Sequence, residues 1–137
     1  MPDRLRGVKS FVLRGGRLTP GQTRALKLHW PKFGRAISDG MLNPRTQFSD
    51  AGPLHLEIGF GMGDFLIEMA TREPDSNFVG IDFSQDGIRK ILARINNLHL
   101  KNIRVVFGDV REKIPLLFKD GELDTVYINF PDPWPRK

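Results

Sequence analysis

The sequence predicts an α/β fold with a mostly parallel sheet and helices on both of its faces. Two patterns predict it. From residue 54 onward, short apolar strands alternate with helical segments, which is typical of βαβ units. Within residues 84–98, apolar side chains recur three, four, seven and ten residues apart, as one buried face of a helix requires. At 137 residues, the chain has the length of about one domain.

Residues 1–50 are predicted to form a basic N-terminal arm that is partly irregular. Glycines and prolines interrupt this stretch repeatedly, so no long helix or strand is expected in it. One short helix is expected over residues 22–30, with Thr19 as its N-cap and Pro20 just inside it. Residues 50–53 are expected to be the hinge into the second part of the chain, residues 51–137.

The second part is predicted to hold four strands, at residues 54–58, 77–82, 103–107 and 124–130. The first helix is expected over residues 64–72, where Pro74 follows its end. Ser84 is expected to cap the next helix. A short helical stretch crossed by Pro115 is expected over residues 110–118.

The charge is spread unevenly along the chain. Residues 1–50 hold 10 Lys and Arg against 3 Asp and Glu, whereas residues 51–137 hold 11 against 13. A basic arm on a near-neutral domain suggests a polyanionic partner such as nucleic acid. A solvated, partly disordered tail would account for the same charge, so composition alone leaves both interpretations open.

Composition also limits the class of protein. The chain has no cysteine, so disulfides and thiolate metal sites are excluded. No apolar run approaches the roughly 20 residues that span a bilayer, and the N-terminus lacks the apolar core of a signal peptide. The three histidines are scattered, and no metal is expected. We therefore expect a cytoplasmic protein that does not contact a membrane, with a monomer as its oligomeric state.

Every predicted strand is followed by a carboxylate, a glycine-rich loop or both. Ligands of parallel sheets bind beyond the carboxyl ends of the strands, at the point where the strand order reverses. A sheet used only as a scaffold would have no need of polar groups at that edge. These candidate site residues are Glu57, Gly59, Gly61, Gly63, Asp82, Asp109 and Asp132.

The first loop has the spacing G-x-G-x-G, which lets backbone approach a ligand closely but is not the G-x-G-x-x-G pattern of pyrophosphate sites. Glu57 before it suits an ammonium or sulfonium group. Asp82 lies where a carboxylate can bind both ribose hydroxyls, and Asp109 can accept from an adenine amino group. Together they indicate S-adenosylmethionine as cofactor. A tight turn without a ligand and a dinucleotide site are the alternatives.

The segment after the fourth strand reads NFPDPWPRK. Pro131 and Pro133 fix the backbone at two positions, so the Asp132 carboxylate and the Trp134 ring are held rigidly at the edge of the predicted site. A rigid acid beside an aromatic ring suits a planar base. Alternatively, the prolines only end a strand and Trp134 packs into the core.

Three segments together resemble one family. LHLEIGFGMGDF, NFPDPWPRK and KSFVLRGGRLT at residues 9–19 resemble the bacterial tRNA (guanine-N7)-methyltransferases. The resemblance covers nearly the whole chain, and its most specific motif is PDPWP. It implies a Rossmann-like class I methyltransferase fold, of which this chain would hold the N-terminal four strands. Relatives of this family continue through three more strands, so the chain is expected to be C-terminally truncated.

The family pattern also implies roles for individual residues. Glu57, Asp82, Asp109 and Asp132 would bind S-adenosylmethionine, and Asp132 would be the catalytic residue. Asp82 departs from the pattern, since relatives usually carry a glutamate there. The substrate-binding residues implied or expected are Trp134, Arg136, Lys137, Arg14 and Arg17.

The resemblance implies methyl transfer to N7 of the guanosine at tRNA position 46, with tRNA as the partner. Basic residues of the arm would bind its phosphates. A methyltransferase acting on an amino or amide nitrogen is an alternative, although such enzymes carry an uncharged N-P-P-Y-like segment after the fourth strand. A non-catalytic tRNA-binding fragment is another, and a nicotinamide oxidoreductase is a distant one.

Overall fold

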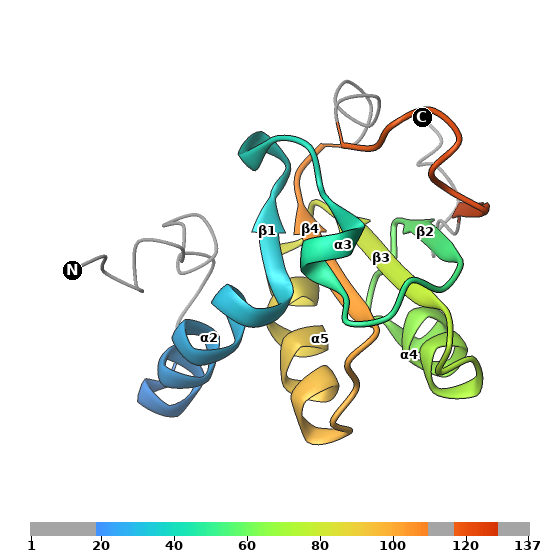
Figure 1. The fold of residues 1–137 in the computed structure, drawn as a ribbon. Coiled ribbons are helices and arrows are strands. Elements are labelled where there is room, and N and C mark those ends of the chain that lie inside the picture. Colours follow the sequence, from blue (N-terminus) through green and yellow to red (C-terminus); the bar gives the residue numbers. More distant parts are fainter. Residues whose placement is uncertain (1–18, 110–116, 129–137) are drawn as a thin grey trace, which may run out of the picture.

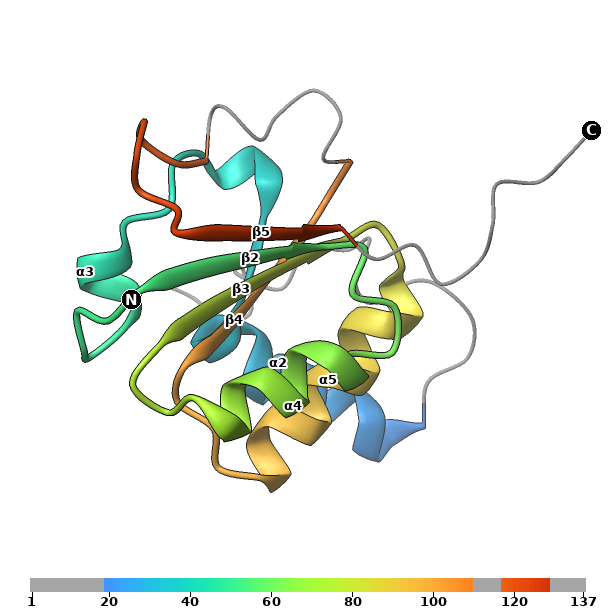
Figure 2. The ribbon, with the colours of Figure 1, turned by 90° about the vertical axis from the view of Figure 1, so that its right-hand side faces the viewer.

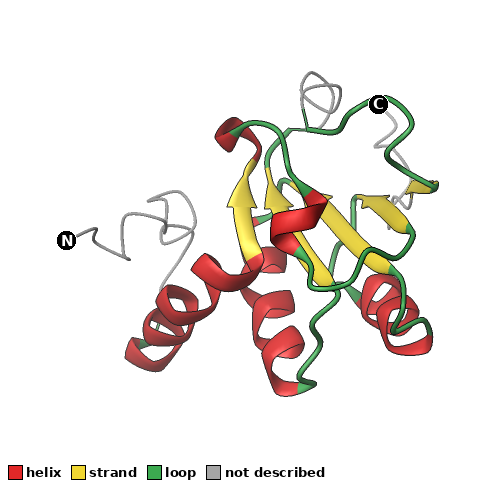
Figure 3. Ribbon diagram, viewed as in Figure 1, coloured by secondary structure: helices red, strands yellow, loops and turns green. Residues whose placement is uncertain are grey.

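The computed structural model describes residues 19–109 and 117–128, and they form one parallel sheet with its helices. The sheet has five strands in the order β1-β4-β3-β2-β5, and every pairing is parallel (Figures 1 and 3). In chain order the elements are α2 (Pro20–Phe33), β1 (Gly34–Ala36), the 3₁₀ helix η2 (Ile37–Asp39), α3 (Pro44–Gln47), β2 (Leu54–Ile58), α4 (Asp64–Arg72), β3 (Asn77–Asp82), α5 (Gln85–Asn97), β4 (Ile103–Phe107) and β5 (Thr125–Ile128).

Most of the predicted elements are confirmed. The strands at 54–58, 77–82 and 103–107 and the helix at 64–72 have the predicted bounds. Ser84 caps α5, because its side chain accepts a hydrogen bond from the backbone N–H of Gly87. The fourth predicted strand is present as β5. Residues 110–116, in the predicted helical stretch, and residues 129–130, at the end of the predicted fourth strand, lie outside the described part.

The three long helices, α2, α4 and α5, cover one face of the sheet (Figure 2). Their apolar sides pack on strand residues that point to that face, such as Phe78 and Val105. The opposite face holds a second apolar cluster, in which Leu56, Val79 and Val106 are 0–1 % exposed. Among the described residues, loop segments and the short α3 and η2 lie on that side. Strands β2, β3 and β4 are therefore buried on both faces, which is why they read as continuous apolar runs, whereas β5 has no buried residue.

Residues 20–48 belong to the packed domain, which corrects the expectation of an arm for this part of the chain. Helix α2 packs on α5, and Trp30, 1 % exposed, lies against Gly34 at the start of β1. Strand β1 adds a fifth strand to the four predicted, pairing with β4 from Gly34↔Val105 to Ala36↔Phe107. The sequence missed it because three residues, one of them glycine, carry no strand pattern.

The Arg104 side chain of β4 also fastens this segment to the sheet. Its guanidinium lies 5.6 Å from the centroid of the Phe33 ring and 5.0 Å from that of Phe48. Both rings come from the segment predicted as an arm. Burial lowers the pKa of Arg104 from its usual range. The group nevertheless stays charged, because a guanidinium keeps its proton in proteins.

The predicted hinge at residues 50–53 is tied to the rest of the domain at several points. The side-chain amide of Asn77 donates to the carbonyl of Asp50 at 2.8 Å, and the Asn77 backbone N–H donates to the carbonyl of Pro53 at 2.7 Å. Gly52 lies against the backbone of Asp75, where no larger residue would fit. These contacts hold the connection in one conformation.

Candidate functional site

The strand order reverses between β2 and β5. The chain passes from β2 to β3 and β4 in one direction and then returns to place β5 on the other side of β2. The carboxyl ends of β2 and β5 therefore border the crevice in which ligands of such sheets bind. Residues 59–63 follow β2 at this edge, and Asp82 closes the neighbouring strand β3.

The glycine loop after β2 has a left-handed backbone at each of its three glycines. The φ angles are +77° at Gly59, +61° at Gly61 and +88° at Gly63. Residues with a Cβ rarely adopt such angles, so the loop needs glycine for its shape. Gly63 also has no room for a side chain, since a Cβ there would lie 2.5 Å from Cδ1 of Ile91. The loop consequently packs closely on α5.

Asp82 holds this loop in place. One carboxylate oxygen accepts a hydrogen bond from the backbone N–H of Gly61 at 2.7 Å. The other accepts from the N–H groups of Phe83 and Ser84 at 2.7 and 3.1 Å. Bonds from neutral donors to a carboxylate are stronger than those between neutral groups. The side chain predicted to bind ribose is thus fixed by backbone amides, and its half-buried position leaves part of it facing solvent.

Helix α5 supports the loop from a second side. A Cβ on Gly87 would lie 2.6 Å from the carbonyl oxygen of Gly61, so the first turn of α5 approaches the loop backbone as closely as atoms allow. Further along the helix, Arg94 donates to the carbonyl of Met62 at 3.0 Å and to the carboxylate of Asp64 at 2.7 Å. Arg94 therefore connects the loop, the start of α4 and α5.

Two more predicted site residues lie at the same edge. Glu57 is 2 % exposed and lies on β2 beside Gly80 of β3, on the face covered by the long helices. Asp109 follows β4 and is half-buried. The structure thus gathers Glu57, the three glycines, Asp82 and Asp109 around the carboxyl ends of adjacent strands.

This edge is also bordered by an aromatic side chain that the sequence analysis did not single out. Phe83 is 67 % exposed, and its ring stacks on that of Phe107 with 5.4 Å between centroids and 26° between planes. A large exposed aromatic ring directly after Asp82 offers a flat apolar surface to a planar group. The position of Phe83 directly after Asp82, the acid that ends a predicted strand, is the sequence signal that could have identified it.

Gly87 and Arg94 were also missed. A glycine in the first turn of an otherwise regular helix signals close approach of another backbone, and this signal was present at Gly87. Nothing in the sequence relates Arg94 to residues 62–64. The remaining predicted site residues lie outside the described part of the chain: Arg14, Arg17, Asp132, Trp134, Arg136 and Lys137.

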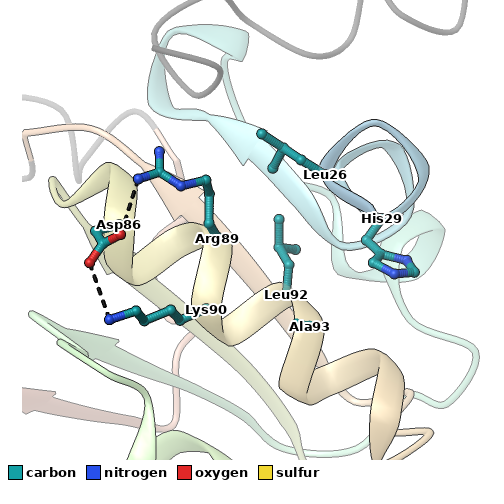
Figure 4. A pocket seen from close by; sticks show the side chains of 7 residues that line it. All are labelled: Leu26, His29, Asp86, Arg89, Lys90, Leu92 and Ala93. Carbon is teal, nitrogen blue, oxygen red and sulfur yellow. Dashed lines mark hydrogen bonds and ion pairs between the residues drawn. The ribbon is translucent and has the colours of Figure 1, made fainter. Parts of the chain in front are cut away.

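Hollows elsewhere on the described surface do not coincide with this edge. One of about 790 Å³ lies at the amino ends of the strands, bordered by Leu54, Asn77 and Asp124. A smaller one of about 170 Å³ lies between α2 and α5 (Figure 4). Among the described residues no three His, Asp or Glu side chains come together as a metal site. Within the same residues no helix has the length and apolar character to cross a membrane.

The strand order, the glycine loop and the acids at the strand ends define a Rossmann-like α/β protein of the class I methyltransferase fold. The chain belongs to the family described as "Putative methyltransferase", whose model matches residues 51–137. A structure from Methanococcus maripaludis, described as a "putative s-adenosyl-l-methionine-dependent methyltransferase", is similar with a TM-score of 0.50 at 20% identity, over 85% of this chain and 53% of that one. This similarity shows the fold.

Curated relatives confirm the resemblance that the motifs indicated. A tRNA (guanine-N(7)-)-methyltransferase of Saccharophagus degradans is 41% identical over 96% of this chain and 58% of its own length. The protein of that name from Alcanivorax borkumensis is 44% identical over 97% of this chain and 56% of its own. The chain therefore spans a little more than half the length of these relatives.

Proposed function

We propose that this chain belongs to an enzyme that transfers a methyl group from S-adenosylmethionine to N7 of guanine in tRNA. The observation that carries the proposal is the identity of 41–44% to tRNA (guanine-N(7)-)-methyltransferases along nearly the whole chain. The edge of the sheet supports it, since the glycine loop and Asp82 form one rigid unit there.

The residues present fit the cofactor. Gly59 and Gly61 are only partly buried and have no side chains of their own, so a ligand can approach the loop backbone there. The acids at this edge lie in different surroundings. Asp82 is fixed by three amides and would bind the ribose hydroxyls, while Asp109 would accept from the adenine amino group. Buried Glu57 would face the cationic amino-acid part, and the exposed Phe83 ring would lie against the adenine. S-adenosylmethionine supplies an electrophilic methyl group.

Methylation of guanine N7 requires no strong general acid or general base. N7 has an in-plane lone pair, and its methylation removes no proton but leaves a cationic purine. The protein must hold N7 in line with the methyl–sulfur bond and stabilise the charge that appears on the base. Asp132 would supply the compensating negative charge, and Trp134 would stack on the base. Both residues lie outside the described part of the chain.

The substrate position is the finer part of the proposal. The target would be the guanosine at position 46 in the variable loop, turned out of its tertiary pairing in order to react. Arg14, Arg17, Arg136 and Lys137 would contact the tRNA. A cytoplasmic location and a monomeric state complete the proposal, the first because tRNA is the substrate.

The test uses the whole protein to which the chain belongs, with an unmodified tRNA transcript and cofactor labelled in the methyl group. Label should appear as 7-methylguanosine after digestion. A matched transcript with 7-deazaguanosine at position 46 lacks the accepting nitrogen and should remain unlabelled. Label on another nucleoside, or the absence of label although the whole protein binds the cofactor, would contradict the proposal.

The role of Asp132 has its own test. Asp132→Ala should lower the rate of methyl transfer far more than the affinity for S-adenosylhomocysteine, because the carboxylate would act on charge that develops only during the reaction. An equal loss in rate and affinity would instead indicate that Asp132 serves only to bind.

A further inference from the structure

Helix α2 turns one side to the core and the other to solvent. Leu26, His29 and Trp30 are each no more than 7 % exposed, and their spacing places them on one side of the helix. The helix contains three Lys or Arg residues and no acidic residue. Its charged side chains are therefore all positive.

The three basic residues form a compact group. Arg24 and Lys32 are exposed and Lys27 is half-buried. They lie within eight residues of one another, which is about 12 Å along a helix axis. Leu28, 55 % exposed, lies among them. We call Arg24, Lys27 and Lys32 the α2 basic face.

Among the described residues, the α2 basic face differs from α4 and α5 in that none of its side chains pairs with a carboxylate. On α4 and α5, Arg72 pairs with Glu68, Lys90 with Asp86 and Arg94 with Asp64, at 2.7–3.6 Å. Across residues 19–109 and 117–128, by contrast, no carboxylate forms an ion pair with a residue of the α2 basic face. Its positive charge is thus available to an external anion.

A hollow lies between α2 and α5, lined on the α2 side by Leu26 and His29 (Figure 4). Lys32 of the α2 basic face lies close enough to His29 for its charge to lower the pKa of that side chain. His29 is only 7% exposed, yet its Nδ1 atom has no hydrogen-bond partner in the described structure. Arg89 and Lys90 line the same hollow, and both pair with Asp86, the one carboxylate among its lining residues. A buried polar atom without a partner is costly, so the hollow has a group that a ligand oxygen or hydroxyl would satisfy.

The helix is also placed to serve the site. It leads directly into β1, which pairs with the second half of β4, and its residues Leu26 and His29 line a hollow together with the N-terminal part of α5. Helix α5 begins just beyond the carboxyl end of β3, so α2 lies near that edge of the sheet. Packing of Trp30 against Gly34 holds the helix rigidly on the sheet. One extended polyanion could therefore contact α2 and the cofactor edge together.

We propose that the α2 basic face, with the adjoining hollow, is a docking surface for the phosphate backbone of the RNA substrate. The proposal rests on the proposed function for the identity of the RNA as tRNA. Binding would be electrostatic and independent of sequence, and it would position the target base rather than select it.

The experiment compares two triple variants with the same change of charge. The first carries Arg24→Gln, Lys27→Gln and Lys32→Gln. The matched control carries Arg45→Gln, Lys101→Gln and Lys119→Gln, three residues that border the hollows at the amino ends of the strands. Glutamine keeps a helix propensity close to that of lysine and arginine, and circular dichroism verifies folding.

Binding of a fluorescent tRNA transcript is measured by anisotropy over a series of salt concentrations. The α2 triple variant should bind about tenfold or more weakly, and its salt slope should fall by about 2–3, since each phosphate that is no longer neutralised lowers the slope by about 1. The control variant should bind nearly as the unaltered chain does. Cofactor titration should be unchanged in both variants.

Equal losses of affinity in the two variants would overturn the proposal, because the loss would then follow net charge and not this face. Unchanged tRNA binding by the α2 variant together with weakened binding to anionic phospholipid vesicles would overturn it as well. Failure of methyl transfer to N7 would affect the proposed function alone, because RNA binding is measured separately.

Discussion

The substitution Gly87→Ala has two opposing effects on stability, and the structure allows their sizes to be compared. Replacing a helical glycine by alanine normally stabilises a helix by up to about 1 kcal/mol. At this position, however, the new Cβ would lie 2.6 Å from the carbonyl oxygen of Gly61. An ordinary contact needs at least 3.4 Å, so the two backbones must separate by about 0.8 Å. Forcing extra volume into a packed site costs about 1–3 kcal/mol.

The expected net result is a loss of stability of up to about 2 kcal/mol, and with it a loss of cofactor binding. The group that must move is the loop backbone, which Asp82 also holds through the Gly61 amide. A displacement approaching 1 Å in such a loop should weaken binding of S-adenosylhomocysteine by about tenfold or more. Thermal unfolding and isothermal titration calorimetry measure the two effects.

Gly21→Ala in α2 is the matched control. A Cβ there would meet its nearest neighbours at 3.8 and 3.9 Å, so only the helix-propensity gain should remain. This variant should melt at the same temperature or slightly higher and bind the cofactor unchanged. The reasoning is refuted if Gly87→Ala also melts at a higher temperature and keeps full affinity.

Three further predictions concern single side chains. Arg94→Met removes the hydrogen bonds to the Met62 carbonyl and to Asp64, each worth about 1 kcal/mol or less at a partly exposed site. Calorimetry should show cofactor binding weakened about threefold to tenfold. Unchanged affinity would show that the loop keeps its conformation without Arg94. Asp82→Asn puts an amino group where a carboxylate oxygen now accepts from backbone amides, so hydrogen exchange at the Gly61 amide should accelerate and the affinity for the cofactor should fall. Unchanged, slow exchange at the Gly61 amide would contradict this prediction. Burial, and secondarily the charge of Lys32, lowers the pKa of His29 below 6.5, so on acidification the unfolded chain binds a proton that the folded chain does not. The free energy of unfolding measured in urea should therefore fall as the pH drops below about 6.5. If the His29→Gln variant shows the same fall, other groups cause it.

The fold of residues 54–109 was accessible from the sequence because each element there carries its own signal. Apolar runs mark strands that are buried on both faces, Ser84 marks a helix start, and the glycines of residues 59–63 mark the loop between β2 and α4. These signals are local, so they can be recognised without knowledge of the tertiary structure. The positions of Glu57, Asp82 and Asp109 at strand ends followed from them.

The role of residues 20–48 was not accessible in this way. Arg104 holds Phe33 and Phe48 on the sheet, and Gly34 forms a strand because Trp30 and β4 flank it. None of these contacts leaves a periodic pattern in the sequence, and the frequent glycines and prolines indicated an irregular arm. Tertiary packing overrode a weak local propensity.

The sequence by itself determined the order of the βαβ units and the kinds of side chain at the strand ends, because both depend on neighbours in the chain. Only the tertiary structure decided that Asp82 would hold the Gly61 amide, that Gly87 would touch the loop, and that Arg94 would reach Asp64 thirty residues away. Those contacts join segments distant in sequence, and their geometry depends on how helices pack on the sheet.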